Sequence, residues 1–458
     1  GTLGDRIGRR RLLLIGAAAL GAASEMAAFS TSAEMLIATR ALLGVAGATL
    51  APSTLSLIRN MFHDEGQRTV AVGVWVTSFS VGAAIGPLIG GVLLEYFWWG
   101  SVFLVAVPVM VLLLVLGPVL LPEYRDPEAG RLDLASAALS LAAVLAVIYG
   151  LKQIAQDGPA WPPALSIVAG LAMGVVFLRR QRVLPYPLLD LRLFRAPAFS
   201  TSLAALCASV FVVGGIFLFV AQYLQVVLGQ GPFEAARWLL PSAVGLVVGS
   251  MLAPLLVRWI RAGAVVAGGL ALAAVGVGVL TQIDAASALA VVVTGTAVMG
   301  LGAGLVGTLA TDLVVGAAPP ERAGTASAVS ETGAELGGAL GIAILGSIGA
   351  AVYRSQVTDA IPPGVSPQDA ETARDTLGGA VATSERLPSR LAADLLDIAH
   401  EAFVQGLQLA AATTAVLVAG LAVLAATLLR GSPPAPGQTV QPTTTPSPLE
   451  ARTTRSGT

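Results

Sequence analysis

Long apolar stretches recur along the whole chain and are separated by short polar connections. A helix needs about 20 apolar residues to cross the hydrocarbon core of a bilayer. Continuous apolar runs predict helices, because the strands of a membrane barrel alternate apolar and polar residues instead. We identify twelve candidate spans, at about 12–30, 35–57, 69–94, 100–121, 133–151, 163–178, 199–224, 235–257, 263–281, 287–316, 324–352 and 402–429.

The composition agrees with an all-α integral membrane protein. Of the 458 residues, 55% are hydrophobic and 12% are charged, whereas a soluble domain carries about 25% charged residues. A net charge of -1 gives no indication of nucleic-acid binding. With Cys207 as the one cysteine and with two histidines, we expect no disulfide framework, no metal site and no cofactor. Nothing indicates an oligomer, so we expect a monomer surrounded by membrane lipids.

Arginine placement predicts the orientation. The loops on one side of the twelve spans collect most of the arginines, whereas the short loops opposite contain only Lys152 and Arg237. The positive-inside rule makes the arginine-rich side cytoplasmic. We therefore expect a multi-pass protein of the cytoplasmic membrane with both chain ends inside. The arginines of that side are Arg6, Arg9, Arg10, Arg11, Arg59, Arg68, Arg125, Arg131, Arg179, Arg180, Arg182, Arg192, Arg195, Arg258, Arg261 and Arg322.

Two segments are expected outside the bilayer. Residues 353–401 form an external insertion that is rich in acids, and its stretch 391–401 has a helical period, which suggests a short amphipathic hairpin. Residues 431–458 are rich in Pro, Thr and Ser and predict a disordered cytoplasmic tail.

The opening segment, Gly1–Arg11, combines glycines, one acid and a run of arginines. Its glycines allow a tight turn and a close approach of helices, and Asp5 can accept hydrogen bonds from a helix N-terminus or an arginine. We interpret it as a gating loop that makes and breaks contacts during a conformational change; an ordinary positive loop is the alternative. The gating residues are Gly1, Asp5, Arg6, Gly8, Arg9 and Arg10.

This segment resembles the signature loop between the second and third helices of the major facilitator superfamily. The resemblance implies two six-helix bundles, and it implies that two helices precede Gly1. Trp98–Pro108 resembles a turn of the fourteen-span drug:proton antiporters, and 133–178 resembles their central pair of extra helices. The implied division is an incomplete N-terminal bundle, a central insertion with a linker, a C-terminal bundle and the tail, at 1–122, 123–198, 199–430 and 431–458.

The third predicted span carries a glycine-rich motif. Gly82, Gly86 and Gly90 share one helical face, which allows another helix to approach closely. Pro87 removes a backbone donor and permits a bend. With Gly91, the motif resembles the one that marks antiporters of the superfamily; simple helix packing is the alternative.

Arg40 and Asp312 are charged residues near or within predicted spans. Charges in the hydrocarbon region are costly and usually functional. The segment around Arg40 resembles the fourth-helix motif of the superfamily, which implies a residue that tunes proton release; an arginine that reaches the outer interface is the alternative. Asp312 is either a proton waypoint or an interface acid.

Glu331 and Glu335 are the most informative acids, because they lie four residues apart and therefore share a helix face. At about 1.5 Å per residue, Glu335 lies roughly 20 Å along the helix from Arg322, within the hydrocarbon. Burial and mutual repulsion both disfavour two charges there, so the pair should take up a proton readily. Two structural acids are the alternative. The segment resembles the corresponding helix of quaternary-ammonium and dye exporters.

These features predict a proton-coupled antiporter that exports lipophilic, often cationic, drugs by alternating access. An exporter of a specific metabolite, siderophore or lipid remains a second interpretation, and a non-transporting membrane scaffold or sensor a third. We find no nucleophile–base constellation and no nucleotide-binding loop, which argues against an enzyme and against ATP as the energy source.

Overall fold

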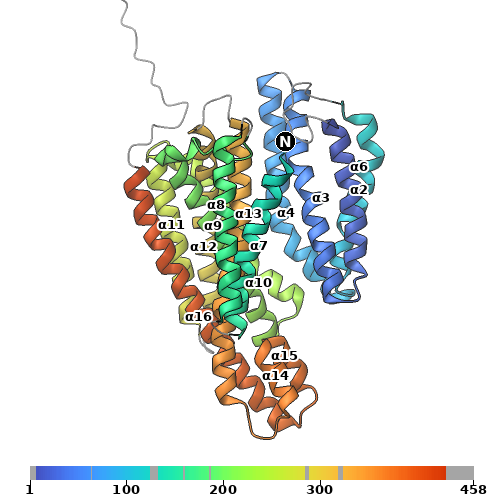
Figure 1. Ribbon diagram of the computed structural model, residues 1–458, viewed down its shortest axis with the longest axis vertical. Helices are drawn as coiled ribbons and strands as arrows, with labels where there is room; N and C mark the ends of the chain where they lie inside the picture. The colour runs from blue at the N-terminus through green and yellow to red at the C-terminus, as the bar shows by residue number, and fades with distance from the viewer. Residues whose placement is uncertain are drawn as a thin grey trace, which may run out of the picture.

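The chain folds into long helices that run roughly parallel to one another (Figure 1). The computed structural model describes residues 7–62, 64–123, 133–157, 160–184, 187–283, 288–317 and 323–429. Within these ranges every regular element is a helix. The predicted tail, 431–458, lies outside the described residues, as do Gly1, Asp5, Arg6 and Arg322.

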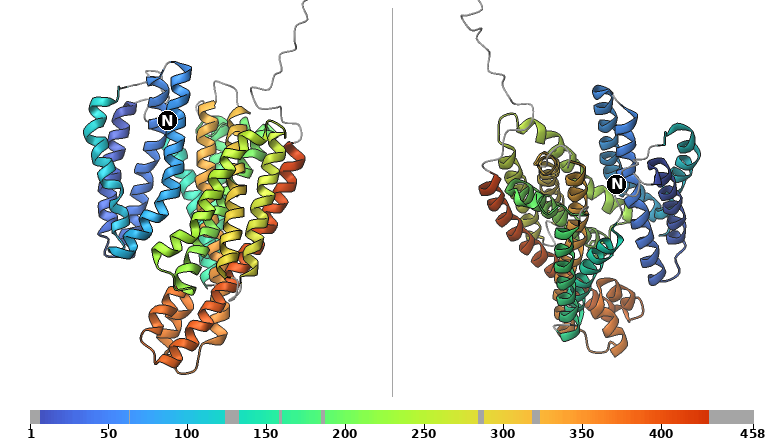
Figure 2. Two further views of the ribbon diagram at one scale, coloured as in Figure 1. Left: turned by 180° about the vertical axis from the view of Figure 1, so that it is seen from behind. Right: turned by 45° about the horizontal axis from the view of Figure 1, so that its top comes forward.

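The N-terminal bundle is the smaller of two helical bodies and lies beside the larger one in Figures 1 and 2. Ser32 and Asp64 start two of its helices, because their side chains accept the backbone N–H groups of Met35 and Gln67. Its helices are α2 (Arg9–Ala28), α3 (Ala33–Met61), α4 (Glu65–Tyr96), α5 (Ser101–Leu104) and α6 (Ala106–Leu120).

The central pair packs as a hairpin, and α7 also contacts α13 of the C-terminal bundle. The pair consists of α7 (Leu134–Asp157) and α8 (Trp161–Val183), and the short helix η1 (Leu193–Arg195) leads on from it. The C-terminal bundle then contains α9 (Pro197–Gln222), the π-helical turn η2 (Tyr223–Val227), α10 (Pro232–Leu256), α11 (Ala262–Val279), η3 (Leu280–Gln282), α12 (Ala288–Gly316), α13 (Ala323–Ala360), α14 (Pro367–Asp375), α15 (Leu377–Ser384) and α16 (Ser389–Leu428).

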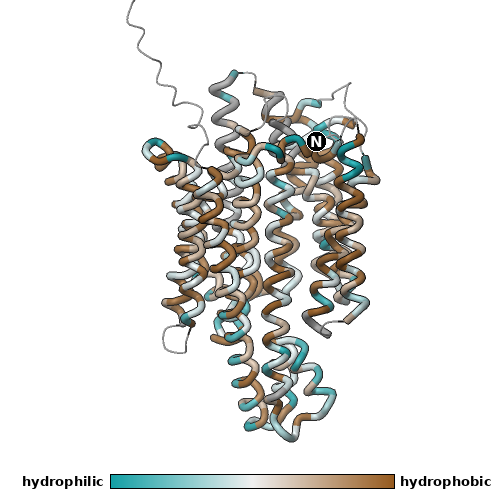
Figure 3. The backbone as a smooth tube through the Cα atoms, turned by 60° about the vertical axis from the view of Figure 1, so that its left-hand side comes forward, coloured by the Kyte–Doolittle hydropathy of each residue, from teal (hydrophilic) through white to brown (hydrophobic). Residues whose placement is uncertain are grey.

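Eleven helices in the described part of the chain are long and apolar enough to cross a membrane. The predicted span 69–94 falls on α4, whose described side chains give a shorter apolar stretch, Ile85–Tyr96. Figure 3 shows apolar residues along the helix shafts and hydrophilic ones gathered at the helix ends. This distribution is that of a multi-pass membrane protein.

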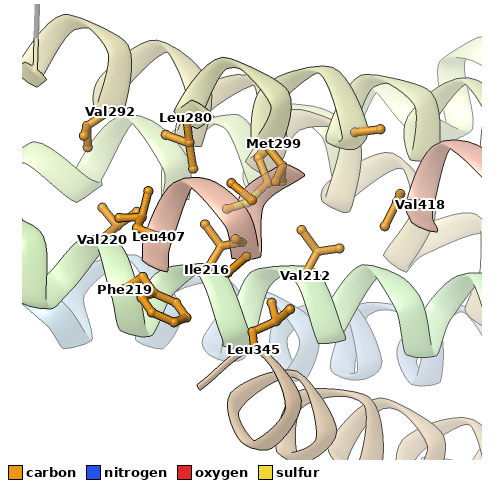
Figure 4. Close-up of a cluster of buried hydrophobic side chains, with 14 of the residues drawn as sticks. Val212, Ile216, Phe219, Val220, Leu280, Val292, Met299, Leu345, Leu407 and Val418 are labelled. Atoms are coloured by element: carbon orange, nitrogen blue, oxygen red, sulfur yellow. The ribbon is translucent and has the colours of Figure 1, made fainter. Parts of the chain in front are cut away.

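The buried core lies in the C-terminal bundle. Val212, Ile216 and Leu345 meet there with side chains from the other helices of that bundle (Figure 4). In α9, α11 and α12 more than half of each span is buried, compared with 11% for the part of α3 at Ala33–Leu50 and 6% for the stretch that contains α6. The first part of α3 and the helix α6 therefore turn most of their side chains outward.

The insertion between α13 and α16 is a folded helical extension. The hydroxyl of Tyr353 donates to the carbonyl of Ala373 at 2.9 Å, and Arg354 pairs with Asp375. Arg386 bridges to Asp369 at 3.2 Å. The stretch 391–401 is helical, as its period predicted, but it is the first part of the long helix α16 and not a short hairpin. No glycine or proline interrupts α16 before Gly406, so the helix runs on without a break.

Candidate transport site

Glu331 and Glu335 lie on one exposed face of α13. Thr332 and Ile342 are exposed on the same face, so the acids belong to a mixed polar and apolar strip. At about 1.5 Å per residue, the two acids lie roughly 12 and 18 Å from the start of the helix. In Figures 1 and 2, α13 is on the side of the C-terminal bundle that lies nearest to the N-terminal helices. The helix that carries the two exposed acids therefore lies where the two bundles face each other.

The opposite face of α13 packs against α9 with the two backbones in contact. A Cβ atom on Gly337 would overlap the carbonyl oxygen of Cys207, and one on Gly341 would overlap that of Phe211. The Cys207 thiol donates to the carbonyl of Gly333 at 3.1 Å. This contact fixes the rotation of α13 and turns its acids away from α9. This contact was not predicted from the sequence, although Gly333, Gly337 and Gly341, four residues apart, are a recognisable signal of close helix packing.

Asp312 is exposed in the last turns of α12, close to the helix end at Gly316. The hydrogen bonds and ion pairs found within the described ranges include none that joins Asp312 to Glu331 or Glu335. The predicted role of Asp312 as a proton waypoint stays a prediction.

Arg40 belongs to the N-terminal bundle, in the second turn of α3. Its guanidinium lies over the ring of Phe103, 5.9 Å from the ring centre. Phe103 in turn meets Trp99 edge to face at 6.2 Å. A cation over an aromatic ring is stabilised by the negative charge of the ring face. This contact is compatible with the second interpretation, an arginine at the outer membrane interface. The first interpretation, in which Arg40 tunes proton release, stays a prediction.

The described part of the gating loop is tied to the end of α6. The backbone N–H of Arg10 donates to Glu123 at 3.2 Å, and the guanidinium of Arg10 donates to the carbonyls of Pro118 at 3.2 Å and Leu121 at 3.0 Å. Arg10 and Arg11 also lie 3.8 and 3.7 Å from the carboxylate of Glu123. The arginine cluster therefore joins α2 to α6. Glu123 was not predicted as part of this loop, because its role depends on a contact with a residue 113 positions away in the sequence.

Gly8 allows this junction to form, and its replacement is expected to weaken it. Its φ of 109° is a conformation that suits glycine, and a Cβ atom here would overlap the carboxylate of Glu123. We expect Gly8→Ala to cost about 1–3 kcal/mol of stability, because strain and overlap add. Thermal unfolding in detergent measures this loss. Gly268→Ala is the control, because nothing lies within 4 Å of that Cβ position in α11, and equal melting of both variants would contradict the expectation.

The glycines of the antiporter motif differ in how closely other helices approach them. Nothing in the described part of the chain lies within 4 Å of a Cβ atom placed on Gly82, Gly86 or Gly90, so the expected close approach of a helix is not seen there. The approach occurs at the neighbouring Gly91, where α4 meets the first turn of α10. Pro87 lies inside α4 between these glycines.

A polar network holds the start of α7 to the end of α8. Arg180 donates to both carboxylate oxygens of Asp133, each at 3.1 Å, and Ser136 bridges Asp133 to Gln181. The guanidinium and the Ser136 hydroxyl hold the pKa of the Asp133 carboxyl well below its usual range. Gln181 also accepts the backbone N–H of Leu189, which anchors the linker toward α9.

Within the described ranges, no group of three or more His, Cys, Asp or Glu residues is placed to hold a metal ion.

The sequence matches a model of one protein family over residues 1–342, which is most of the chain. That model describes the Major Facilitator Superfamily. The chain belongs to this superfamily. Its members are membrane transporters and not enzymes. The family match also confirms the superfamily fold that the signature loop led us to expect.

Similar proteins are exporters and resistance proteins of bacteria. The chain is 42% identical to the multidrug efflux pump LfrA of Mycolicibacterium smegmatis, over 94% of this chain and 84% of LfrA. It is 36% identical to the methyl viologen resistance protein SmvA of Salmonella typhimurium, over 88% of this chain and 81% of SmvA. It is 32% identical to the tetracenomycin C resistance and export protein of Streptomyces glaucescens, over 95% and 82% of the two chains.

Solved structures show the same fold at low sequence identity. A bacterial homologue of the human lysosomal transporter Spinster, crystallised in an inward-facing and unoccupied conformation, superimposes with a TM-score of 0.60. The two chains are 17% identical, and the match covers 93% of this chain and 85% of that one. This likeness concerns the fold alone.

Proposed function

We propose that this member of the Major Facilitator Superfamily exports lipophilic, often cationic, drugs in exchange for protons, by alternating access across the cytoplasmic membrane. The observation that carries the proposal is the pair Glu331 and Glu335 on the open face of α13. A carboxylate in a membrane span binds either a proton or an organic cation, and competition between the two couples their movements. The names of LfrA and SmvA, which concern multidrug efflux and methyl viologen resistance, support this substrate class.

The orientation follows from the arginine-rich loops, which we place in the cytoplasm. The Arg10–Glu123 junction then lies inside, and the contact between α4 and α10 lies outside. The two acids lie nearer to the cytoplasmic end of α13. The arrangement of fourteen spans stays a prediction.

The test is transport by purified protein in vesicles that have an acidic interior. We expect ethidium and methyl viologen to accumulate inside, and we expect accumulation to stop when an ionophore removes the pH gradient. Accumulation that ignores the gradient would contradict proton exchange. Equal fluxes in protein-containing and protein-free vesicles would contradict the transport of these cations.

A specific natural product is the second candidate substrate. The similarity to the tetracenomycin C resistance and export protein favours it, because that name concerns a single compound. The same vesicles would separate the two candidates. A multidrug exporter carries chemically unrelated cations at comparable rates, whereas an exporter of one product carries that product alone.

A further inference from the structure

The helix α10 begins without a cap of its own. Its N-cap residue is Gly231, which has no side chain, and its first residue is Pro232, which has no backbone N–H. The first free donor of the helix is therefore the N–H of Phe233. Free N–H groups at a helix start need a partner, and a side chain from the N-cap position usually provides it.

Glu95, in the last turn of α4, provides the missing cap. Its Oε2 atom accepts the Phe233 N–H at 3.2 Å. The same oxygen lies 3.4 Å from the position that a Cβ atom on Gly231 would occupy, so a bare N-cap leaves room for the carboxylate. A negative charge at this end also meets the positive end of the helix dipole. The cap of a helix in the C-terminal bundle is thus supplied by the N-terminal bundle.

Gly91, one turn before Glu95 in α4, lies against the first turn of α10. A Cβ atom on Gly91 would lie 2.9 Å from the Cα atom of Phe233 and 3.0 Å from the carbonyl oxygen of Pro232. Such distances leave no space for a side chain, so the backbone of α4 rests directly on the first turn of α10. Ala236, which is buried, faces the same glycine. Glu95 and Gly91 therefore hold one small contact between the bundles.

We propose that Glu95 is a latch that holds the outer ends of the two bundles together. Its carboxylate caps α10 only while the end of α4 and the start of α10 are in contact. The proposal rests on the alternating-access function and the orientation proposed above. Opening toward the outside separates α4 from α10 and leaves the Phe233 N–H to water. Because the cap stabilises only the closed state, its loss shifts the balance toward the open state by about three- to thirty-fold, the range of helix-cap effects.

Labelling of a buried cysteine measures this balance. In a Cys207→Ser background, Ala236→Cys places a thiol under Gly91, where a membrane-impermeant maleimide reaches it from outside only after α4 and α10 separate. We expect Glu95→Ala to raise the labelling rate about tenfold and Glu95→Gln, which keeps an acceptor but not the charge, to raise it less. Glu234→Ala is the matched control, because Glu234 is an exposed acid in the first turn of α10 itself and cannot join the bundles.

A covalent latch gives a second and independent measurement. In the same cysteine-free background, Glu95→Cys with Gly231→Cys is joined by a short bis-methanethiosulfonate reagent. We expect cross-linking to stop ethidium transport and reduction to restore it. Unchanged labelling in Glu95→Ala, or full transport by the cross-linked protein, would overturn the latch. Neither result would affect the proposed function, which fails only if the unmodified protein does not exchange the cations for protons.

Discussion

Glu335→Gln is expected to abolish proton-linked export of cations and to flatten the pH dependence of ethidium binding. Glutamine keeps the size of the side chain and can still form hydrogen bonds, but it neither releases a proton nor attracts a cation. Glu335 lies about 18 Å along α13, where no other acid shares its face except Glu331 among the described residues of that helix. The variant would therefore lose the carboxylate of the strip that lies furthest from the start of α13.

Glu331→Gln is expected to have the same effect in a weaker form. Glu331 lies one turn nearer to the helix start and thus nearer to the cytoplasmic water in the proposed orientation. One proton shared by the pair leaves one negative charge, which is enough to hold a monocation. The single variants should therefore retain different fractions of the coupling, and the double variant should retain none.

The measurement is ethidium binding and counterflow by purified protein from acid to neutral pH. Glu25→Gln is the control, because Glu25 is an exposed acid in a membrane helix of the other bundle. A double glutamine variant with the pH dependence of the unmodified protein would move the coupling elsewhere, and Asp312 would then be the next candidate.

The long apolar runs predicted the helices well, because a chain in lipid must satisfy every backbone hydrogen bond within each span. The shared face of Glu331 and Glu335 also followed from the sequence, since the helical period alone places residues four apart together. These are local properties. Each depends on residues within one or two turns of each other.

Contacts between distant segments did not follow in the same way. The sequence places Glu123 after α6 and Glu95 at the end of α4, but it does not show that they meet Arg10 and Phe233. The glycines of the antiporter motif illustrate the difference. Their spacing indicated a face for close packing, and among them the described part of the fold places a close contact at Gly91, because the crossing point of two helices depends on the whole bundle.

Gly337→Ala is expected to reduce transport at least about tenfold, although it lies outside the acidic strip. The added methyl group would overlap the backbone carbonyl of Cys207. A backbone atom of a packed helix cannot move aside as a flexible side chain can, so α13 must shift or rotate against α9. Overpacking of this kind costs about 1–3 kcal/mol. The shift would also displace Glu335, two residues away.

Gly338→Ala is the matched control on the same turn of α13. Its methyl group would meet only the side chain of Val210, at 3.4 Å, which is an ordinary contact. We expect this variant to transport ethidium and to melt like the unmodified protein, while Gly337→Ala melts lower and transports poorly. If both variants transport equally well, the backbone contact between α9 and α13 does not set the position of the acids. Because the two glycines are neighbours in sequence and only Gly337 would overlap a backbone atom of α9, a difference between the variants reports the α9 contact itself.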